Sequence, residues 1–347
     1  MKEKFDFDDI LIEGESVSDI DSRKEIKIYD DNGMLPLFTA PMLSVVDKEN
    51  SKIFNENKIY SIIPRGINSS YVDSHKFNFV ARSLEEFRLS FNVRHVLKLE
   101  EPIYVCIDIA NGHMKKLHDE IKEAKDLFEN KIIIIAGNVG SPGAFKELAK
   151  TGVDYIRCGI GNGNGCLTTQ QTGVGYPMGS LIKECSLIKQ QEGFSTKIIA
   201  DGGFKKYADI IKALALGADY VMLGSIFNKA LESAGKTLDG NFKEVDPTSQ
   251  EVIDYVINPG PRCIYKEFYG MSTKHAQKII GKSVDNLRTS EGIHKRQAVE
   301  YTLNGWVDNF VHYLSTAMSY TYSKDLSDFQ QVKFNLITES AYNRFKK

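Results

Sequence analysis

The stretch KIIIIAGNVGSPGAFKELAKTGVDYIRCGI, residues 131–160, contains a short apolar run, an amphipathic segment and a second short apolar run. Both apolar runs are short and end in glycine or asparagine, which is typical of strands buried on both faces. The segment between them has helical periodicity and ends in glycine. We interpret the stretch as strand, helix and strand, which is the repeating unit of a parallel sheet.

The same alternation continues along the chain. Five more apolar runs occur at residues 34–41, 59–64, 103–110, 197–203 and 219–225, with helical patterns at 113–129 and 205–217. The regular spacing from Ile103 to Ser225 predicts an α/β fold, a closed (β/α)8 TIM barrel with its active site at the C-terminal face, rather than an open sheet. We expect the eighth strand within 262–271, and a closing helix within 298–318 that packs its apolar face on the barrel.

The bulk properties predict one domain, residues 1–347, with an irregular polar insertion at about 226–262 and a polar tail after residue 322. The formal net charge of -2 gives no reason to expect nucleic acid or an anionic membrane as a partner. No apolar run approaches membrane-spanning length, and the charged N-terminus shows no secretory signal. The five cysteines include no C-x-x-C pair, so we expect a reducing, cytoplasmic location.

Glycine-rich loops follow two neighbouring predicted strands, and in such barrels the working residues lie in the loops after the strands. Asp201, Gly202 and Gly203 follow one strand, and Gly224 and Ser225 follow the next. Glycines there let backbone N–H groups approach a phosphate closely, and Asp201 is placed to accept hydrogen bonds from ribose hydroxyls. The alternative interpretation is that these glycines only form tight turns.

A longer loop, GIGNGNGCLTTQQTGVGYP at residues 159–177, carries Cys166 among glycines. Glycine costs entropy on folding, so its abundance indicates a backbone path that side chains would obstruct. A thiol in such a loop above a phosphate site is a candidate covalent nucleophile. A cysteine taken alone is more often a small buried hydrophobic residue, and we interpret Cys158, inside a predicted strand, in that way.

This loop resembles the catalytic loop of the IMP dehydrogenase/GMP reductase family. Other motifs of that family recur in order, namely DIANGH (108–113), IIAGNVGSPGAFKELAKTGVDYIRCGIG (134–161), IIADGG (198–203), ALGADYVMLGS (215–225), FYGMS (268–272) and SEG (290–292). The resemblance covers roughly residues 20–320, and this many ordered motifs are far more specific than a lone glycine pattern.

The resemblance is closer to the reductase branch of the family. The chain leaves no room for CBS domains after residues 59–64, and FYGMS resembles the reductase string rather than the YRGMG-like string of dehydrogenases. Residues 272–290 are too few for a dehydrogenase flap and contain no Arg-Tyr pair. The resemblance therefore implies NADPH-dependent reductive deamination of GMP to IMP and ammonia. The alternatives are an IMP dehydrogenase that lacks CBS domains and a catalytically weak purine-nucleotide-binding protein.

The resemblance also implies a role for each matching residue. Cys166 would attack C2 of the purine, with Thr168 and Glu291 as the proton relay to the leaving ammonia. The substrate would contact Asp201, Gly202, Gly203, Gly224, Ser225, Gly270, Met271, Ser272, Arg288, Ser290 and Gly292. The cofactor NADPH would contact Arg65, Asp108, Ile109, Ala110, Ile160, Gly161, Ser315 and Thr316, and would be reached by Ser22 and Arg23 of a neighbouring subunit. Potassium would bind the backbone carbonyls of Gly161, Gly163 and Cys166, and the assembly would be a homotetramer.

Three segments depart from the family pattern. TAPMLSVV at 39–46 lacks the usual aspartate and threonine, IIPRG at 62–66 has Arg65 where a histidine-lysine pair is usual, and GNGNGC at 161–166 lacks the usual proline and serine. Together with the insertion they indicate a divergent member, and they leave the choice between NADPH and NADH open.

Overall fold

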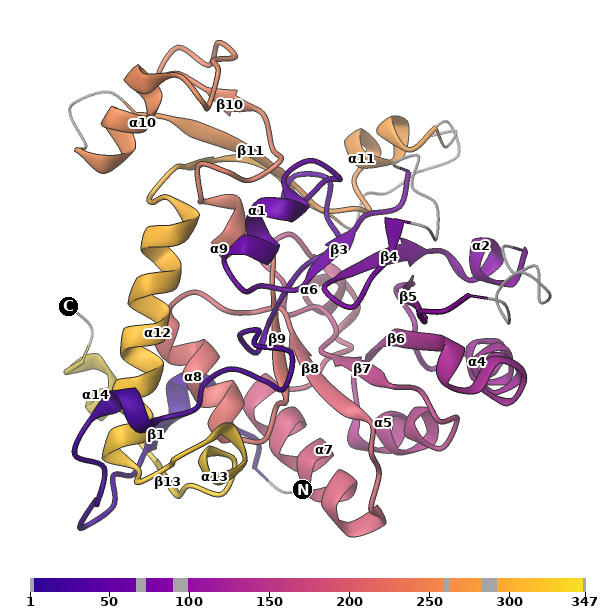
Figure 1. Cartoon of the computed structure of the whole chain (residues 1–347), viewed down its shortest axis with the longest axis vertical. Helices are drawn as coiled ribbons and strands as arrows, with labels where there is room; N and C mark the ends of the chain where they lie inside the picture. The colour runs from indigo at the N-terminus through magenta and orange to yellow at the C-terminus, as the bar shows by residue number, and fades with distance from the viewer. Residues whose placement is uncertain (1–2, 67–72, 90–98, 259–262, 282–291, 346–347) are drawn as a thin grey trace.

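The structure, a computed structural model, describes residues 3–66, 73–89, 99–258, 263–281 and 292–345. Its centre is a sheet of eight parallel strands surrounded by helices (Figure 1). These strands are β2 (Leu37–Thr39), β3 (Ser61–Ile63), β4 (Asn78–Arg82), β5 (Ile103–Asp108), β6 (Ile132–Val139), β7 (Tyr155–Cys158), β8 (Lys197–Asp201) and β9 (Tyr220–Leu223). Their order is β2-β9-β8-β7-β6-β5-β4-β3, and a parallel bridge from Phe38 to Tyr60 joins the two ends. The predicted (β/α)8 barrel is confirmed.

All seven predicted strands are present, but the predicted position of the eighth is wrong. The eighth barrel strand is β4, whereas β11 (Tyr265–Tyr269) pairs antiparallel with β10 (Thr237–Leu238) and β12 (His294–Ala298) in a separate sheet. β11 alternates buried and partly exposed residues over most of its length, as a strand of a one-sided antiparallel sheet does.

β4 escapes detection because it begins with Asn78 and ends with Arg82, so it lacks a continuous apolar run. The hydrogen-bonding groups of the buried Asn78 side chain have partners in the preceding part of the chain. Ser61 donates to Asn78 Oδ1 at 2.6 Å, and Asn78 Nδ2 donates to the carbonyl of Asp73 at 2.9 Å. A buried polar residue costs little when its hydrogen bonds are made, and here tertiary partners make them.

The helices outside the barrel alternate with its strands. They are α1 (Ser51–Glu56), α2 (Leu84–Leu89), α4 (Lys115–Phe128), α5 (Pro142–Ala149), α7 (Met178–Glu192), α8 (Tyr207–Ala215) and α9 (Ser225–Asn228), with the short α6 (Thr168–Thr172) between β7 and α7. Ser141 caps α5 by accepting from the N–H of Ala144 at 3.2 Å, ahead of Pro142 at the first position. Gly217 ends the turn after α8 with φ +108, a conformation that L residues avoid.

The predicted closing helix is α12 (Leu303–Tyr320), and its apolar face packs on the barrel through Leu303, Trp306, Val307, Phe310 and Leu314. It begins later than the sequence pattern indicates. Thr302 caps it by accepting from the N–H of Gly305, whereas Ala298 ends β12 and residues 299–302 connect the strand to the helix. Two short helices follow, α13 (Leu326–Phe329) and α14 (Glu339–Asn343), and β13 (Phe334–Leu336) pairs with β1 (Ile10–Ile12) near the N-terminus.

The segment 226–262 is more regular than expected. It contributes β10 to the three-stranded sheet and also contains α10 (Gln250–Ile257). The sheet projects from the barrel beside α9 and α12 (Figure 1). A small apolar cluster of Leu231, Val252 and Ile264 holds this sheet together. α11 (Lys274–Ile279) follows β11 and lies near the open end of the barrel.

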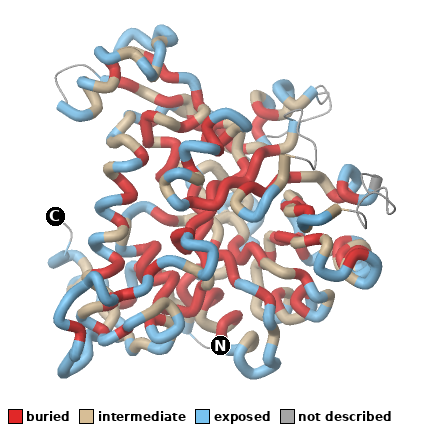
Figure 2. The backbone as a smooth tube through the Cα atoms, viewed as in Figure 1, coloured by how far each residue is buried: buried red, intermediate tan, exposed pale blue. Residues whose placement is uncertain are grey.

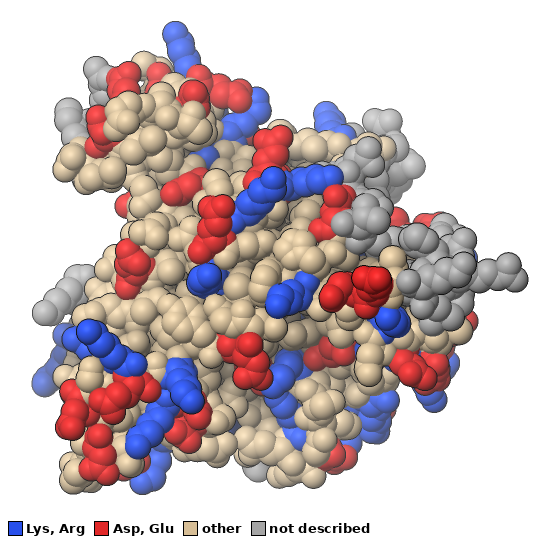
Figure 3. Space-filling view, in the orientation of Figure 1, with Lys and Arg blue, Asp and Glu red and all other residues tan. Residues whose placement is uncertain are grey.

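The barrel is filled from inside by an aromatic cluster. The Phe38 ring stacks on Tyr60 with centroids 4.8 Å apart and meets the edges of Phe79, Tyr155 and Tyr220. Figure 2 shows the buried residues concentrated along these central strands. The charged side chains of both signs are interspersed on the face drawn in Figure 3, in line with the small net charge. None of the helices in the described part of the chain is both long and apolar enough to cross a membrane.

Phe38→Ala should lower the free energy of unfolding by about 3–5 kcal/mol, the range for truncating a buried phenylalanine. Phe38 is fully buried and lies at the centre of the aromatic cluster. Urea denaturation of wild type and variant measures the change. Phe345→Ala is the control because Phe345 is 64% exposed, and it should shift stability by less than about 0.5 kcal/mol. Equal losses for the two variants would show that the cluster does not hold the barrel.

Candidate active site

A cavity of ≈ 790 Å³ opens at the C-terminal ends of the barrel strands. Its walls come from the loops after β2, β5, β6, β7, β8 and β9 and from the turn between β11 and α11. The sequence places glycine-rich loops and Cys166 at this end, and the structure brings them together here. The volume is within the range of cavities that bury whole small ligands.

The loop after β7 carries Cys166 at the cavity wall, where the residue is half-buried. The Cys166 thiol donates to Thr168 Oγ1, with 3.2 Å between sulfur and oxygen. The backbone N–H of Cys166 donates to the carbonyl of Gly163 at 2.9 Å. Gly161 has φ +77, and a Cβ there would collide with the hydroxyl of Thr169. A Cβ on Gly165 would likewise lie 3.1 Å from the Phe268 ring, so contacts with neighbouring side chains explain the glycines at positions 161 and 165.

The segment that begins at Gly292 pairs with the loop of Cys166. A β-bridge pairs Cys166 with Gly292, the N–H of Ile293 donates to the carbonyl of Gly165 at 3.1 Å, and the N–H of Gly270 donates to the carbonyl of Ile293 at 3.2 Å. A Cβ on Gly292 would lie 2.9 Å from Ser272 Oγ, so a larger residue there would displace the Ser272 side chain. Gly270, Met271 and Ser272 line the cavity, while Arg288, Ser290 and Glu291 lie outside the described residues.

The two loops predicted to bind phosphate lie side by side at the cavity wall. Gly202 and Gly203 have φ +93 and +89, and a Cβ on Gly202 would lie 3.0 Å from the backbone nitrogen of Gly163. On the next strand, Ser225 Oγ accepts from Asn164 Nδ2 at 3.2 Å. The glycines are therefore required by close backbone approach, and they leave N–H groups near the cavity.

A buried network of charges forms the floor of the cavity. Arg157 on β7 donates to Asp108 Oδ1 at 2.9 Å and to Asp201 Oδ2 at 2.8 Å. Asp108 also accepts from Arg65 Nε at 3.1 Å, and Asp201 also accepts from Asn138 Nδ2 at 2.7 Å. Burial alone raises the pKa of Asp108, but the guanidinium groups of Arg157 and Arg65 outweigh it and hold that pKa below its usual value.

Sequence reasoning missed Arg157 and Asn138, although a signal for Arg157 was present. An arginine inside the apolar strand DYIRCGI must find a carboxylate if that strand is buried. Arg157 is 7% exposed, and the two aspartates that follow β5 and β8 are its partners. His113 and Asn111 also line the cavity without having been predicted.

Six of the predicted cofactor residues line the cavity, namely Arg65, Asp108, Ile109, Ala110, Ile160 and Gly161. The other predicted cofactor residues do not. Arg23 begins the single turn η2 (Arg23–Glu25), and its Nη1 donates to Thr316 Oγ1 on α12 at 2.8 Å. Ser22 caps that turn, and Ser315 is buried. The structure thus gathers these four residues outside the barrel, away from the cavity of the same chain.

A family model described as "IMP dehydrogenase / GMP reductase domain" matches residues 22–249, which is more than half of the chain. The chain therefore belongs to the IMP dehydrogenase / GMP reductase family. Both activities in that description are oxidoreductions, so the chain is an oxidoreductase.

Curated relatives cover most of the chain. A "GMP reductase" of Caenorhabditis elegans is 28% identical over 94% of this chain and 89% of the relative. A "GMP reductase" of Staphylococcus epidermidis is 29% identical over 98% of both proteins. "GMP reductase 2" of Bos taurus is 35% identical over 60% of this chain and 52% of the relative.

Arg157→Met should lower the free energy of unfolding by about 3–5 kcal/mol at neutral pH, because it leaves two buried carboxylates without their partner. The pKa of Asp108 is lowered in the folded protein. The contribution of this carboxylate to the free energy of unfolding is therefore present above the ordinary carboxyl pKa of about 4, and it is lost as the pH falls through the lowered pKa. Urea denaturation at a series of pH values should therefore show the difference from wild type shrinking in acid.

Arg88→Met is the control for this experiment, because Arg88 is an exposed arginine on α2. It should leave stability nearly unchanged at every pH. A deficit of Arg157→Met that stays constant from neutral pH to about pH 3 would contradict the ion-pair explanation.

Proposed function

We propose that the protein is a GMP reductase, which converts GMP and NADPH to IMP, ammonia and NADP⁺. The observation that carries this proposal is the position of Cys166, whose thiol lies at the cavity wall beside two glycine loops and next to the Thr168 hydroxyl. Relatives along the full length of the chain bear the name GMP reductase, and this supports the same chemistry.

In the proposed reaction the Cys166 sulfur bonds to C2 of the guanine ring and the bond from C2 to the exocyclic nitrogen breaks. The leaving nitrogen takes up protons and departs as ammonia, and the thiolate departs from C2 when hydride arrives there. An amine leaves readily only when it is protonated, so a proton relay is needed. Thr168 Oγ1, which accepts from the thiol at 3.2 Å, is the first member of that relay. Glu291 is proposed as the second.

The rest of the nucleotide is held by the loops after β8 and β9. The orientation of the Asp201 carboxylate is fixed because its Oδ2 accepts from both Arg157 and Asn138. This arrangement leaves Oδ1 to accept from the ribose hydroxyls. The backbone N–H groups around Gly202, Gly203, Gly224 and Ser225 would receive the phosphate. Gly270, Met271 and Ser272 would contact the base, together with Gly292 and with Arg288 and Ser290.

The cavity residues also suit a nicotinamide cofactor. NADPH would supply the hydride, and the strip formed by Ile109, Ala110, Ile160 and Gly161 offers an apolar surface for a flat ring beside Cys166. The Arg65 guanidinium lies in the same cavity, paired with Asp108. Ser22, Arg23 and Thr316 lie together beside α12, outside the cavity, and the adjacent Ser315 is buried. We propose that Ser22 and Arg23 reach the cofactor bound by a neighbouring subunit of a homotetramer, and that Ser315 and Thr316 contact the far end of the cofactor.

A potassium ion is proposed at the catalytic loop, on the carbonyls of Gly161, Gly163 and Cys166. Carbonyl oxygens suit hard cations. The Gly163 carbonyl already accepts from the Cys166 N–H at 2.9 Å, and its second lone pair is available to an ion. A cation there would stabilise the loop conformation that presents the thiol.

Cys166→Ala should remove turnover while leaving GMP binding largely intact, because loss of a covalent nucleophile removes the reaction path itself. Steady-state kinetics and calorimetric GMP titration measure the two properties. The matched control is Cys263→Ala, since Cys263 is exposed and outside the cavity, and it should retain activity. If Cys166→Ala keeps more than about a tenth of the wild-type rate, which corresponds to only ~1.4 kcal/mol of barrier, the covalent mechanism is wrong.

The direction of the reaction is tested by two incubations followed at the absorbance of reduced nicotinamide. GMP with NADPH should consume NADPH and form IMP and ammonia in equal amounts, and NADH should be a poorer substrate because a guanidinium favours the 2′-phosphate. IMP with NAD⁺ should give negligible XMP, since that reaction needs a water-activating flap. XMP formed at a rate comparable to the first reaction would identify the protein as a dehydrogenase instead.

A further inference from the structure

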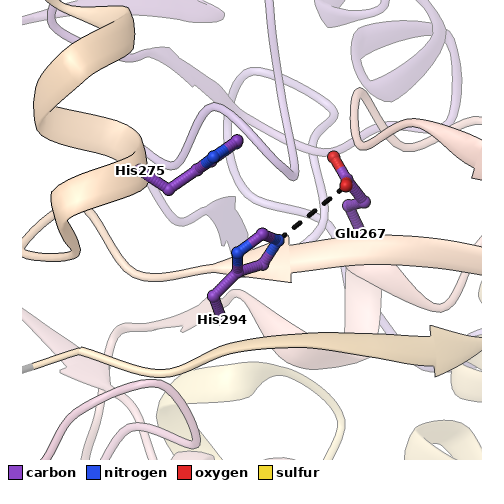
Figure 4. Close-up of side chains that lie close together, drawn as sticks. All are labelled: Glu267, His275 and His294. Carbon is purple, nitrogen blue, oxygen red and sulfur yellow. Dashed lines mark ion pairs between the residues drawn. The ribbon is translucent and has the colours of Figure 1, made fainter.

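Three potential metal ligands meet on the small three-stranded sheet, outside the cavity described above. Glu267 lies on β11, His275 on α11 and His294 on β12, and their ligand atoms all lie within 4.8 Å of one another (Figure 4). We name these three residues the His–Glu cluster. We propose that it is a binding site for a late first-row transition-metal ion of the Zn²⁺ class, distinct from the nucleotide and potassium sites.

The pairing of β11 with β12 explains how the cluster forms. Tyr269 is opposite His294, and Glu267 is opposite Arg296, so Glu267 and His294 are diagonal neighbours on one face of the sheet. Glu267 Oε1 lies 3.8 Å from His294 Nε2. The turn at Gly270–Ser272 then returns the chain so that His275 stacks on His294, with ring centroids 4.6 Å apart. Three residues from three elements thus point to one place.

The donor set is the one that zinc uses in proteins, two imidazole nitrogens and a carboxylate oxygen. Metal–ligand bonds of about 2.0–2.2 Å place two ligand atoms no more than about 4.4 Å apart on one ion. The cluster reaches that limit with small rotations of exposed or half-buried side chains, because Glu267 and His294 are 19% and 42% exposed.

The donor atoms of the cluster decide which class of ion fits. A hard cation such as Mg²⁺ or Ca²⁺ is bound mainly through several oxygens and their negative charge, and the cluster offers one carboxylate. Imidazole nitrogens are suitable ligands for late transition metals. The two histidines and one carboxylate of the cluster therefore favour zinc-class ions over Mg²⁺.

The location of the cluster connects it to the cavity. The opposite face of β11 presents Phe268, whose ring would lie 3.1 Å from a Cβ on Gly165 of the catalytic loop. Gly270–Ser272, which line the cavity, lie in the chain between Glu267 and His275, and Gly292, which is bridged to Cys166, lies just before His294. An ion bound to all three ligands would link β11, α11 and β12, and would thereby restrict the motion of Gly270–Ser272 and Gly292 beside the cavity.

The test is calorimetric titration of tag-free, metal-free protein with Zn²⁺, repeated with Co²⁺ to record its absorption spectrum. We expect one ion per chain and a cobalt spectrum without a thiolate charge-transfer band. His275→Ala and His294→Ala should each weaken binding at least about tenfold, because even changes around metal ligands cost 10–100-fold. His312→Gln, a change at an exposed histidine on α12, should bind zinc as wild type does, and Mg²⁺ should give no heat.

Hydrogen exchange supplies an independent readout. Zinc should slow amide exchange in peptides covering residues 265–281 and 292–298 of wild type and should leave them unchanged in His294→Ala. Circular dichroism establishes that the variants are folded, which the exposure of His294 leads us to expect. The proposal is overturned if wild type binds no zinc, if both histidine variants bind it as wild type does, or if a thiolate band assigns the ion to a cysteine. None of these outcomes depends on the GMP reductase assay.

Discussion

The arrangement of the cavity depends on one buried cation. Arg157 lies inside β7 and reaches Asp108 at the end of β5 and Asp201 at the end of β8. Arg65 after β3 and Asn138 on β6 complete the network, so five of the barrel strands or their loops meet at these charges. A buried charge is tolerated only when it is paired and hydrogen-bonded. The need to pair Arg157 therefore fixes the ends of the strands relative to one another, and with them the loops that hold Cys166 and the glycines.

The second constraint is the close packing of the loops that lie above this charged network. The loop of Cys166 packs so closely on Thr169, and its neighbour Gly163 so closely on Gly202, that side chains at the glycines would collide. The paired strands β11 and β12 pack against this loop, through the bridge of Cys166 to Gly292 and the contact of Phe268 with Gly165. Neutral contacts thus hold the Cys166 thiol in a defined place next to Thr168.

Sequence patterns are incomplete where interacting residues lie far apart in the chain. β4 has too few apolar residues to be recognised as a buried strand. Its polar residue Asn78 can be buried because Ser61 and Asp73 supply its hydrogen bonds. The segment 226–262 looks irregular because β10 has only two residues and gains its pairing from β11. Arg157 would be an unpaired charge in a buried apolar strand without Asp108 and Asp201, which the fold places beside it. Each of these features is stable only through contacts that no local pattern contains.

The sequence by itself determined the alternation of strands and helices, the barrel class, and the glycine loops with Cys166 at one end, because periodicity and turn chemistry are local properties. Tertiary structure alone decided which segment forms the eighth barrel strand, which cation neutralises Asp108 and Asp201, and which segment covers the loop of Cys166. It also decided that Glu267, His275 and His294 meet, although they are spread over three elements. Those outcomes depend on burial and long-range pairing, which become energetically defined only when the whole barrel has closed.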